Sequence, residues 1–195
     1  QVIKKEYNID LHKAKYFAGH SLGEYSAIAC ASYLDFKDTI KILKKRGDAM
    51  QNAVPNGVGG MLAVLGTTVE SIEKILNDHK DNFKAEIAND NSEGQIVLSG
   101  KIKDLEKLSS ILKHNKIKNV KLPVSAPFHC SLMKKATDIM SIELNKLNFK
   151  KGNNVLISNI TANEIFNAEE LKNLLTQQIE KRVRWRESVK NMVNK

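Results

Sequence analysis

Hydrophobic and polar positions alternate along this chain in two different patterns. Short apolar runs that end at glycine or turn residues predict buried strands, and longer segments with apolar positions three and four residues apart predict amphipathic helices. The strand pattern occurs at 16–18, 60–66, 85–88, 95–100, 117–124 and 155–158. The helix pattern occurs at 24–31, 35–52, 69–79, 103–115, 131–147 and 168–179. Within the helix predicted over 35–52, we expect Ile40, Leu43 and Ala49 to share the buried side.

The middle of the chain has its own order of elements. Between a break at 54–57 and Pro127, the order is strand, helix, strand, strand, helix, strand, with a turn-rich loop predicted over 89–94. This order is typical of the split βαβ, or ferredoxin-like, arrangement. We therefore expect an α/β fold with a discontinuous catalytic core over 1–53 and 127–195 and an inserted ferredoxin-like subdomain over 54–126. At 195 residues the chain is long enough for both.

The most specific motif is Gly-His-Ser-Leu-Gly at 19–23, between a predicted strand and a predicted helix. A G-x-S-x-G sequence in that context is typical of a nucleophile elbow. Ser21 should then occupy a strained turn, with Gly19 and Gly23 letting the neighbouring backbones pass closely. The N–H of Leu22 is a candidate oxyanion-hole donor, because the first amides of a helix have no partner within it. The motif predicts that Ser21 is the nucleophile of an acyl-transfer enzyme.

A serine nucleophile needs a base, and His129 is the better of two candidates. His20 follows Gly19 directly and should point away from the serine hydroxyl, whereas His129 lies where the inserted subdomain returns to the core, and such junctions line clefts. Arg46 is a candidate to turn inward and hold a substrate carboxylate through two parallel hydrogen bonds, with Met50 one turn later on the same face. No acidic partner for His129 stands out, so a main-chain carbonyl or amide is the expected alternative.

Composition narrows the class of protein. The net charge of +9 comes from lysine-rich helix faces, and it suits an acidic protein or a phosphorylated cofactor as well as a merely solvated surface. Aromatic residues make up only 6% of the chain, and with no nucleic-acid-binding motif we expect no nucleic acid partner.

No apolar run is long enough to span a membrane. The two cysteines have no metal-site spacing, so we expect no metal and a cytoplasmic location. Residues 1–5 carry no signal-peptide core and are interpreted as the tail of a helix, so we expect a fragment.

Several segments together resemble the bacterial malonyl-CoA:acyl carrier protein transacylases, in the same order and over essentially the whole chain. They are 19–27, 45–51, 60–66, 91–100, 122–133 and 178–185. The resemblance implies an α/β-hydrolase-like core with a ferredoxin-like insertion and a role in fatty acid synthesis. It also implies that coenzyme A thioester and phosphopantetheine are substrates and that no cofactor is needed. We expect a monomer whose partners are malonyl-CoA and acyl carrier protein.

The same resemblance implies a role for individual residues. Ser21 would take the malonyl group from coenzyme A as an ester and pass it to the phosphopantetheine thiol of acyl carrier protein, in a ping-pong reaction. His129 would act as base and acid, and Arg46 would pair with the malonyl carboxylate. The main-chain carbonyl of Gln178 would orient the histidine, and Leu22 N–H would serve the oxyanion hole. A further residue, Phe128, is similar to the pattern in acyltransferase domains that choose malonyl over methylmalonyl.

The chain departs from the family in two places. The family's N-terminal segment with its Gly-Gln-Gly turn and its late Gly-Pro-Gly segment are absent, so we expect the intact protein to be active and this chain to be weak or inactive. Three alternatives stay open: an acyltransferase domain of a polyketide or fatty acid synthase, a serine esterase of α/β type, and a non-catalytic module that binds acyl carrier protein. Arg46 separates transferase from esterase, because an enzyme for neutral esters has no use for a buried guanidinium.

Overall fold

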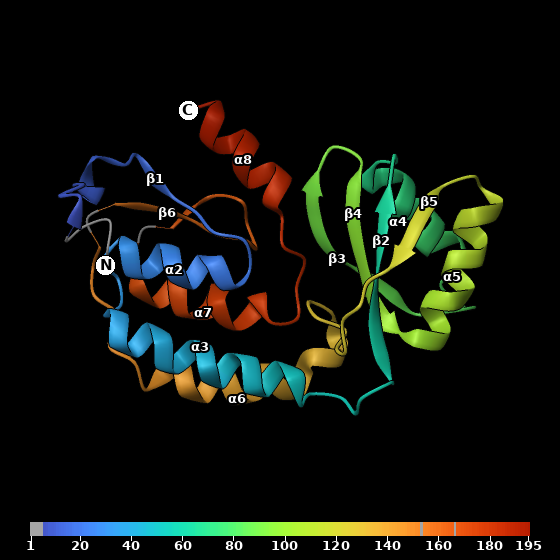
Figure 1. Cartoon of the computed structure of the whole chain (residues 1–195), viewed down its shortest axis with the longest axis horizontal. Helices are drawn as coiled ribbons and strands as arrows, with labels where there is room; N and C mark the ends of the chain where they lie inside the picture. The colour runs from blue at the N-terminus through green and yellow to red at the C-terminus, as the bar shows by residue number, and fades with distance from the viewer. Residues whose placement is uncertain (1–5, 153, 166) are drawn as a thin grey trace.

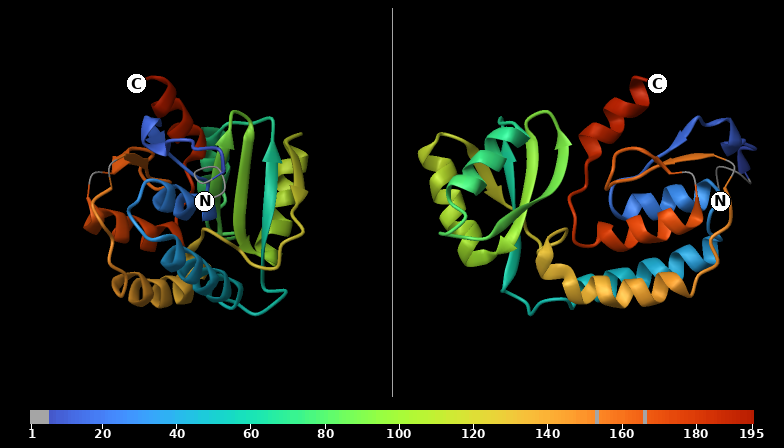
Figure 2. Two further views of the ribbon diagram at one scale, coloured as in Figure 1. Left: turned by 60° about the vertical axis from the view of Figure 1, so that its left-hand side comes forward. Right: turned by 180° about the vertical axis from the view of Figure 1, so that it is seen from behind.

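The computed structural model describes residues 6–152, 154–165 and 167–195. The chain folds into two parts that lie side by side and are joined by two crossings, one after α3 and one after β5 (Figures 1 and 2). The larger part is formed by both ends of the chain, and the smaller part by its middle. The mixed α/β class predicted from the hydrophobic pattern is confirmed. The helical tail expected at 1–5 lies outside the described residues.

The larger part is a small sheet with helices stacked beneath it (Figure 1). Its sheet has the order β1-β6-β7, with β1 parallel to β6 and β7 antiparallel to β6. Its strands are β1 (Tyr16–Phe17), β6 (Val155–Ile157) and β7 (Glu164–Ile165). Its helical elements are η1 (Leu11–Lys13), α2 (Leu22–Cys30), α3 (Phe36–Gln51), η2 (Ser131–Met133), α6 (Lys134–Asn145), α7 (Ala168–Gln178) and α8 (Trp185–Val193).

The buried side of α3 matches the expected one at Ala49, which is buried, and at Leu43, which packs partly buried against the core, but not at Ile40. Ile40 is 52% exposed, so its predicted place in the core is wrong, whereas Ile42 is 2% exposed and Ala49 and Met50 are buried. Positions 42, 46, 49 and 50 follow the helical spacing of three and four residues, which puts them on one face. Arg46 belongs to this buried face, between apolar neighbours one turn away on either side. The charged side chain of Arg46 is therefore directed into the core.

The smaller part is a four-stranded sheet covered on one face by two helices (Figure 1). The strand order is β3-β4-β2-β5, and every neighbouring pair is antiparallel. The strands are β2 (Gly59–Leu65), β3 (Ala85–Ser92), β4 (Gln95–Lys101) and β5 (Lys118–Lys121), and the helices are α4 (Val69–Asp78) and α5 (Ile102–His114). A separate apolar core fills the space between them, built from Leu62, Val64, Ile72, Ile96, Leu98, Leu108 and Leu112.

The loop expected over 89–94 is largely strand. β3 continues to Ser92 with two irregularities in its pairing to β4, and only residues 93 and 94 form the turn. The reason is a second pairing partner on its other edge: Asp90 N–H donates to the Val183 carbonyl at 2.9 Å, and Val183 N–H donates to the Ala88 carbonyl at 2.8 Å. A polar segment that resembles a turn in sequence is thus held extended from both sides.

The same edge joins the two parts of the molecule. The Arg186 guanidinium at the start of α8 donates two hydrogen bonds of 2.8 Å to the two carboxylate oxygens of Asp90. The Asp90 side chain is fully buried and that of Arg186 is 19% exposed. A bidentate pair in this setting fixes both position and angle of the groups it joins. Because Val183 and Arg186 follow closely on α7, the end of α7 is held against β3.

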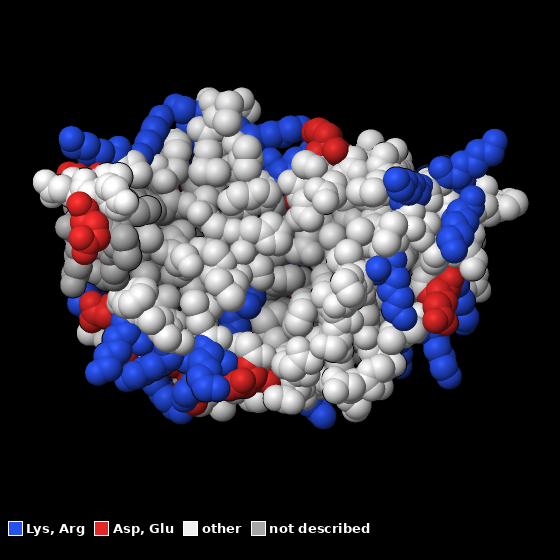
Figure 3. Space-filling model, viewed as in Figure 1, with Lys and Arg blue, Asp and Glu red and all other residues white. Residues whose placement is uncertain are grey.

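The outer surface carries the positive charge. In the view of Figure 3, lysine and arginine side chains lie around the periphery of both parts, and the middle of this face is mostly uncharged. This distribution agrees with charge borne by helix faces rather than by one basic tail. Within the described ranges, no helix combines the length and apolar character that crossing a membrane requires.

Candidate active site

Ser21 sits on a strained turn between β1 and α2. Its φ of 53° and ψ of −106° lie in a region that residues with a side chain rarely adopt, which costs on the order of 1–3 kcal/mol. A Cβ added to Gly19 would lie 2.0 Å from the Gly23 carbonyl carbon, so only glycine fits there. A Cβ on Gly23 would meet nothing within 4 Å. The expectation that both positions need glycine for close passage is therefore wrong for position 23. Only Gly19 must lack a side chain, because it lies against the backbone of Gly23.

The side chain of Asn159 holds this turn in place. Its Oδ1 accepts a hydrogen bond from Ser21 N–H at 2.7 Å, and its Nδ2 donates to the Gly19 carbonyl at 2.8 Å. Asn159 is fully buried and lies two residues after β6. Sequence reasoning missed it, although a polar residue just beyond a buried strand of an α/β sheet is a signal for a site residue. These two bonds offset part of the strain at Ser21.

Three groups form a hydrogen-bonded chain that starts at the Ser21 hydroxyl. Ser21 Oγ lies 2.8 Å from His129 Nε2, and His129 Nδ1 lies 2.7 Å from the main-chain oxygen of Gln178. A carbonyl oxygen only accepts, so Nδ1 carries the proton and Nε2 accepts from the hydroxyl. Burial, followed by the nearby positive charge of Arg46, lowers the pKa of His129 to about 3. The imidazole is therefore neutral at neutral pH and ready to accept the serine proton.

Arg46 reaches the same hydroxyl from α3. Its Nη2 donates to Ser21 Oγ and to the side-chain Oε1 of Gln178, both at 2.9 Å. The residue is 6% exposed, its Cζ lies 5.6 Å from the centre of the Tyr25 ring, and its Nε has no hydrogen-bond partner among the residues described. Among the residues that the structure describes, no carboxylate forms an ion pair with the Arg46 guanidinium. Burial lowers the pKa of the guanidinium, which favours an anion as a further partner.

These groups open into a cleft of about 490 Å³ between the two parts of the molecule. Met50 and Phe128 line it together with Ser21, Arg46 and His129. Other lining side chains come from the four-stranded part, namely Met61, Asn89, Asn91 and Val97. The cleft thus brings together the nucleophile candidate, its base and the arginine, as the sequence predicted, and adds asparagines that sequence reasoning did not single out.

Leu22 and His20 flank the nucleophile candidate differently. Leu22 is the first residue of α2, so its N–H has no acceptor within the helix, and its side chain is 55% exposed. His20 Nε2 lies 2.8 Å from Asn91 Oδ1, and its ring makes an edge contact with Trp185 at 5.8 Å. The imidazole of His20 is therefore engaged with β3 and α8 rather than with the Ser21 hydroxyl, in line with the structural role expected for it.

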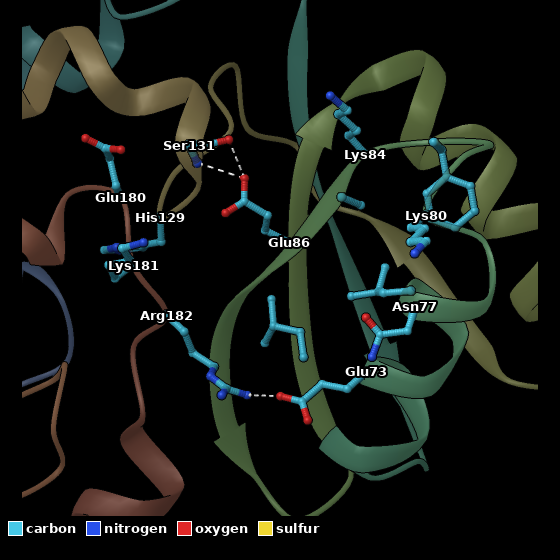
Figure 4. A pocket seen from close by; sticks show the side chains of 14 residues that line it. Glu73, Asn77, Lys80, Lys84, Glu86, His129, Ser131, Glu180, Lys181 and Arg182 are labelled. Atoms are coloured by element: carbon cyan, nitrogen blue, oxygen red, sulfur yellow. Dashed lines mark hydrogen bonds and ion pairs between the residues drawn. The ribbon is translucent and has the colours of Figure 1, made fainter.

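A second cleft, of about 600 Å³, also reaches His129 (Figure 4). Its walls are α4 and β3 on one side and His129, Ser131 and residues 180–182 on the other, and two contacts bridge them. Arg182 Nη1 donates to Glu73 Oε1 at 3.0 Å, and Ser131 N–H donates to Glu86 Oε1 at 2.9 Å. Ser21 lines the smaller cleft, so that cleft is the candidate active site. Among the residues described, no group of three His, Cys, Asp or Glu side chains is placed to hold a metal ion.

Comparison with known proteins agrees with this geometry. Residues 12–195 match the model of the acyl transferase domain family. The chain is 37% identical over 176 residues to a malonyl CoA-acyl carrier protein transacylase of Escherichia coli (strain K12), an alignment that covers 90% of this chain and 57% of the relative. The crystal structure of an acyl-carrier-protein S-malonyltransferase from Bartonella henselae matches with a TM-score of 0.94 and 37% identity, covering 98% of this chain and 62% of that one.

A third match comes from polyketide synthesis. A malonyl-transacylase solved in complex with its type II polyketide-synthase acyl-carrier protein matches with a TM-score of 0.92 and 33% identity, covering 98% of this chain and 62% of that one. Across these three relatives, the chain therefore spans 57% to 62% of their length.

Proposed function

Because the chain belongs to the acyl transferase domain family, we propose that it moves a malonyl group from coenzyme A to the phosphopantetheine thiol of an acyl carrier protein. One observation carries the proposal: a buried guanidinium without a carboxylate partner in the described residues lies 2.9 Å from the Ser21 hydroxyl. A malonyl group esterified to Ser21 ends in a carboxylate about two bonds beyond its carbonyl carbon. Arg46 is in place to receive that carboxylate in a pair of charge-assisted hydrogen bonds.

In the first half of the reaction, Ser21 is the nucleophile. His129 Nε2 takes the hydroxyl proton while Oγ attacks the thioester carbonyl of malonyl-CoA. Leu22 N–H donates to the resulting oxyanion, a contact worth about 3 kcal/mol of transition-state stabilisation in comparable sites. The carbon–sulfur bond then breaks, the imidazolium returns its proton to the departing thiolate, and the malonyl group remains on Ser21 as an ester.

The second half runs the same steps in reverse with a new thiol. The phosphopantetheine thiol gives its proton to His129 and attacks the ester carbonyl, and the Ser21 oxygen leaves and recovers the proton. Gln178 orients the imidazole of His129 through its neutral main-chain carbonyl rather than through a carboxylate. We infer that His129 is therefore only a modest base. A modest base suits transfer to a thiol, because thiols ionise far more readily than water.

Arg46 favours this reading over an esterase for neutral substrates. Burying a guanidinium is costly unless an anion compensates it, and a neutral acyl group supplies none. We propose that Met50 and Phe128, which line the cleft beside Arg46, limit the size of the acyl group and so favour malonyl over methylmalonyl.

The architecture proposed for this function is an α/β-hydrolase-like core over 1–53 and 127–195 with a ferredoxin-like insertion over 54–126. The antiparallel order β3-β4-β2-β5, with α4 and α5 on one face, supports the ferredoxin-like description. The strained serine between a strand and a helix supports the description of the core.

The wider setting is also part of the proposal. We propose a cytoplasmic monomer that works on malonyl-CoA and acyl carrier protein, without metal, cofactor or nucleic acid. Fatty acid synthesis is the proposed pathway, and the likeness to the transacylase bound to a polyketide carrier protein supports polyketide synthesis as the second candidate. The two pathways differ in the carrier protein that receives the malonyl group.

Mass spectrometry of the full-length protein that contains this chain, after exposure to malonyl-CoA, tests the proposal. We expect one malonyl group on the peptide that contains Ser21, and none in the Ser21→Ala variant. Ser26→Ala is the matched control, because Ser26 is an exposed serine on the same helix, and it should label like the wild type. A label that survives Ser21→Ala would overturn the assignment of the nucleophile.

A further inference from the structure

The side-chain amide of Gln178 forms hydrogen bonds with three residues of the candidate active site, Arg46, Ser21 and Glu24. Its Oε1 accepts from Arg46 Nη2 at 2.9 Å. Its Nε2 donates to the Ser21 main-chain carbonyl at 3.0 Å and to Glu24 Oε2 at 2.5 Å. Gln178 is fully buried, so neither end of the amide can turn to water instead. The direction in which this amide points therefore decides whether Arg46 faces an acceptor or another donor.

Glu24 is a buried carboxylate that the proposed reaction leaves unused. It lies on the first turn of α2, three residues after the nucleophile, and is 2% exposed. Its Oε1 accepts from Asn159 N–H at 3.2 Å, and its Oε2 accepts from Gln178 Nε2. An ionised carboxylate accepts and cannot donate. Both of its oxygens are thus engaged by donors from segments that build the site.

We propose that Glu24 is a positioning residue for Arg46, acting through the amide of Gln178. The two hydrogens of Gln178 Nε2 point to the Ser21 carbonyl, which can only accept, and to Glu24, which only accepts in its ionised form. The amide oxygen is then left to face the guanidinium. Glu24 thereby fixes the amide in the one orientation that holds Arg46, and a negative charge compensates the buried arginine from a distance.

Because the amide of Gln178 lies between Glu24 and Arg46, the guanidinium stays available to a ligand. A carboxylate in direct contact with the guanidinium would compete with the carboxylate of the acyl group, whereas a neutral amide between them does not. Burial raises the pKa of Glu24 to about 7, opposed by its bonds from Gln178 and Asn159 and by the charge of Arg46. Burying this carboxyl group costs folding stability, and we infer that the carboxyl is kept because it orients the amide of Gln178.

The proposal rests on the proposed function for what Arg46 binds, and Glu24→Gln tests it. A glutamine at this position offers one acceptor oxygen, so either Asn159 N–H or Gln178 Nε2 is left facing an amino group. We expect the rate of Ser21 acylation by malonyl-CoA to fall about tenfold, with acylation by acetyl-CoA changed less than about twofold. Introduced into Arg46→Ala, the same substitution should leave the malonyl-to-acetyl ratio unchanged. Glu106→Gln, an exposed carboxylate on α5, is the control.

A second measurement does not depend on catalysis. In ¹⁵N NMR spectra, rotation about the Cζ–Nε bond of Arg46 should be slow in the wild type and faster in Glu24→Gln, while Arg186, held by Asp90, serves as the unchanged reference. Equal losses with both acyl donors, additive effects in the double variant, or unchanged rotation of Arg46 would each overturn the proposal. A full-length wild-type protein that forms no malonyl ester would refute the proposed function instead, and the NMR measurement alone would then decide whether Glu24 positions Arg46.

Discussion

Replacing Arg46 with alanine should separate malonyl transfer from acetyl transfer. The guanidinium is 6% exposed and directed at Ser21 Oγ, so its bonds to a ligand carboxylate would form away from water. Two charge-assisted hydrogen bonds of about 1.5–3 kcal/mol each correspond to a loss of roughly 10²–10⁴-fold. Removing one partner from a buried charge pair, at about 2–5 kcal/mol, corresponds to a loss of roughly 30-fold to several thousandfold. Acetyl-CoA presents no carboxylate, so its reaction should change by less than about tenfold.

The assay is single-turnover acylation of Ser21 followed by mass spectrometry of the intact protein with each donor. Lys44→Ala is the matched control, since Lys44 is a cation on the same helix whose side chain is 78% exposed and pairs with Asp48. It should react like the wild type with both donors. Equal losses for malonyl and acetyl in Arg46→Ala would show that the arginine supports the site as a whole, and the assignment of Arg46 to the acyl carboxylate would be abandoned.

Three further predictions concern the fold and the base. Gly19→Ala should lower the melting temperature sharply, because its Cβ would lie 2.0 Å from backbone, while Gly23→Ala, with open space around it, should not; similar melting curves would contradict the close approach. Asp90→Asn should cost about 1.5–3 kcal/mol in urea unfolding, because it removes the charge from a buried bidentate pair and leaves Glu93, at 3.4 Å, as the remaining carboxylate partner of Arg186; a loss below about 0.5 kcal/mol would refute this. Since the pKa of His129 is lowered to about 3 from 6.5, the unfolded state binds the extra proton, and the stability that depends on His129 should fall as pH drops from about 6.5 towards 3. His129→Gln should remove that part of the acid-side loss in unfolding measured across this range.

Local features of the site were readable from the chain alone. The strand, strained turn and helix around Ser21 depend on residues within about ten positions of one another, and the glycine at 19 with small residues after it is enough to indicate them. The inward direction of Arg46 was also indicated, because neighbours at helical spacing are apolar. His129 was found from its place at a junction between two predicted units. Each of these signals is short-range or positional.

The contacts of the polar partners of the site had no such signal. Asn159, 138 residues from Ser21, holds the turn, and Glu24 meets Gln178 across 154 residues. The local sequence of Glu24 does not distinguish it from a surface residue. The place of Asn159 just beyond a strand indicates a site residue but not which groups it binds, because these contacts arise only when α2, α7 and the end of β6 come together. The same holds for Ile40, which matched a helical face in sequence but lies on the exposed side of α3.

The strand character of residues 89–92 shows most clearly where the sequence stops being sufficient. Asn, Asp and Ser favour turns in isolation, since their side chains compete for backbone hydrogen bonds. Pairing with Val183 and the ion pair to Arg186 overrule that preference. The sequence by itself determined the elbow, the helices and the candidates for the reacting groups, because those depend on local geometry and periodicity. Only the tertiary structure decided which distant donors and acceptors complete the site, because a buried hydrogen bond is specified by where chains meet and not by their spacing.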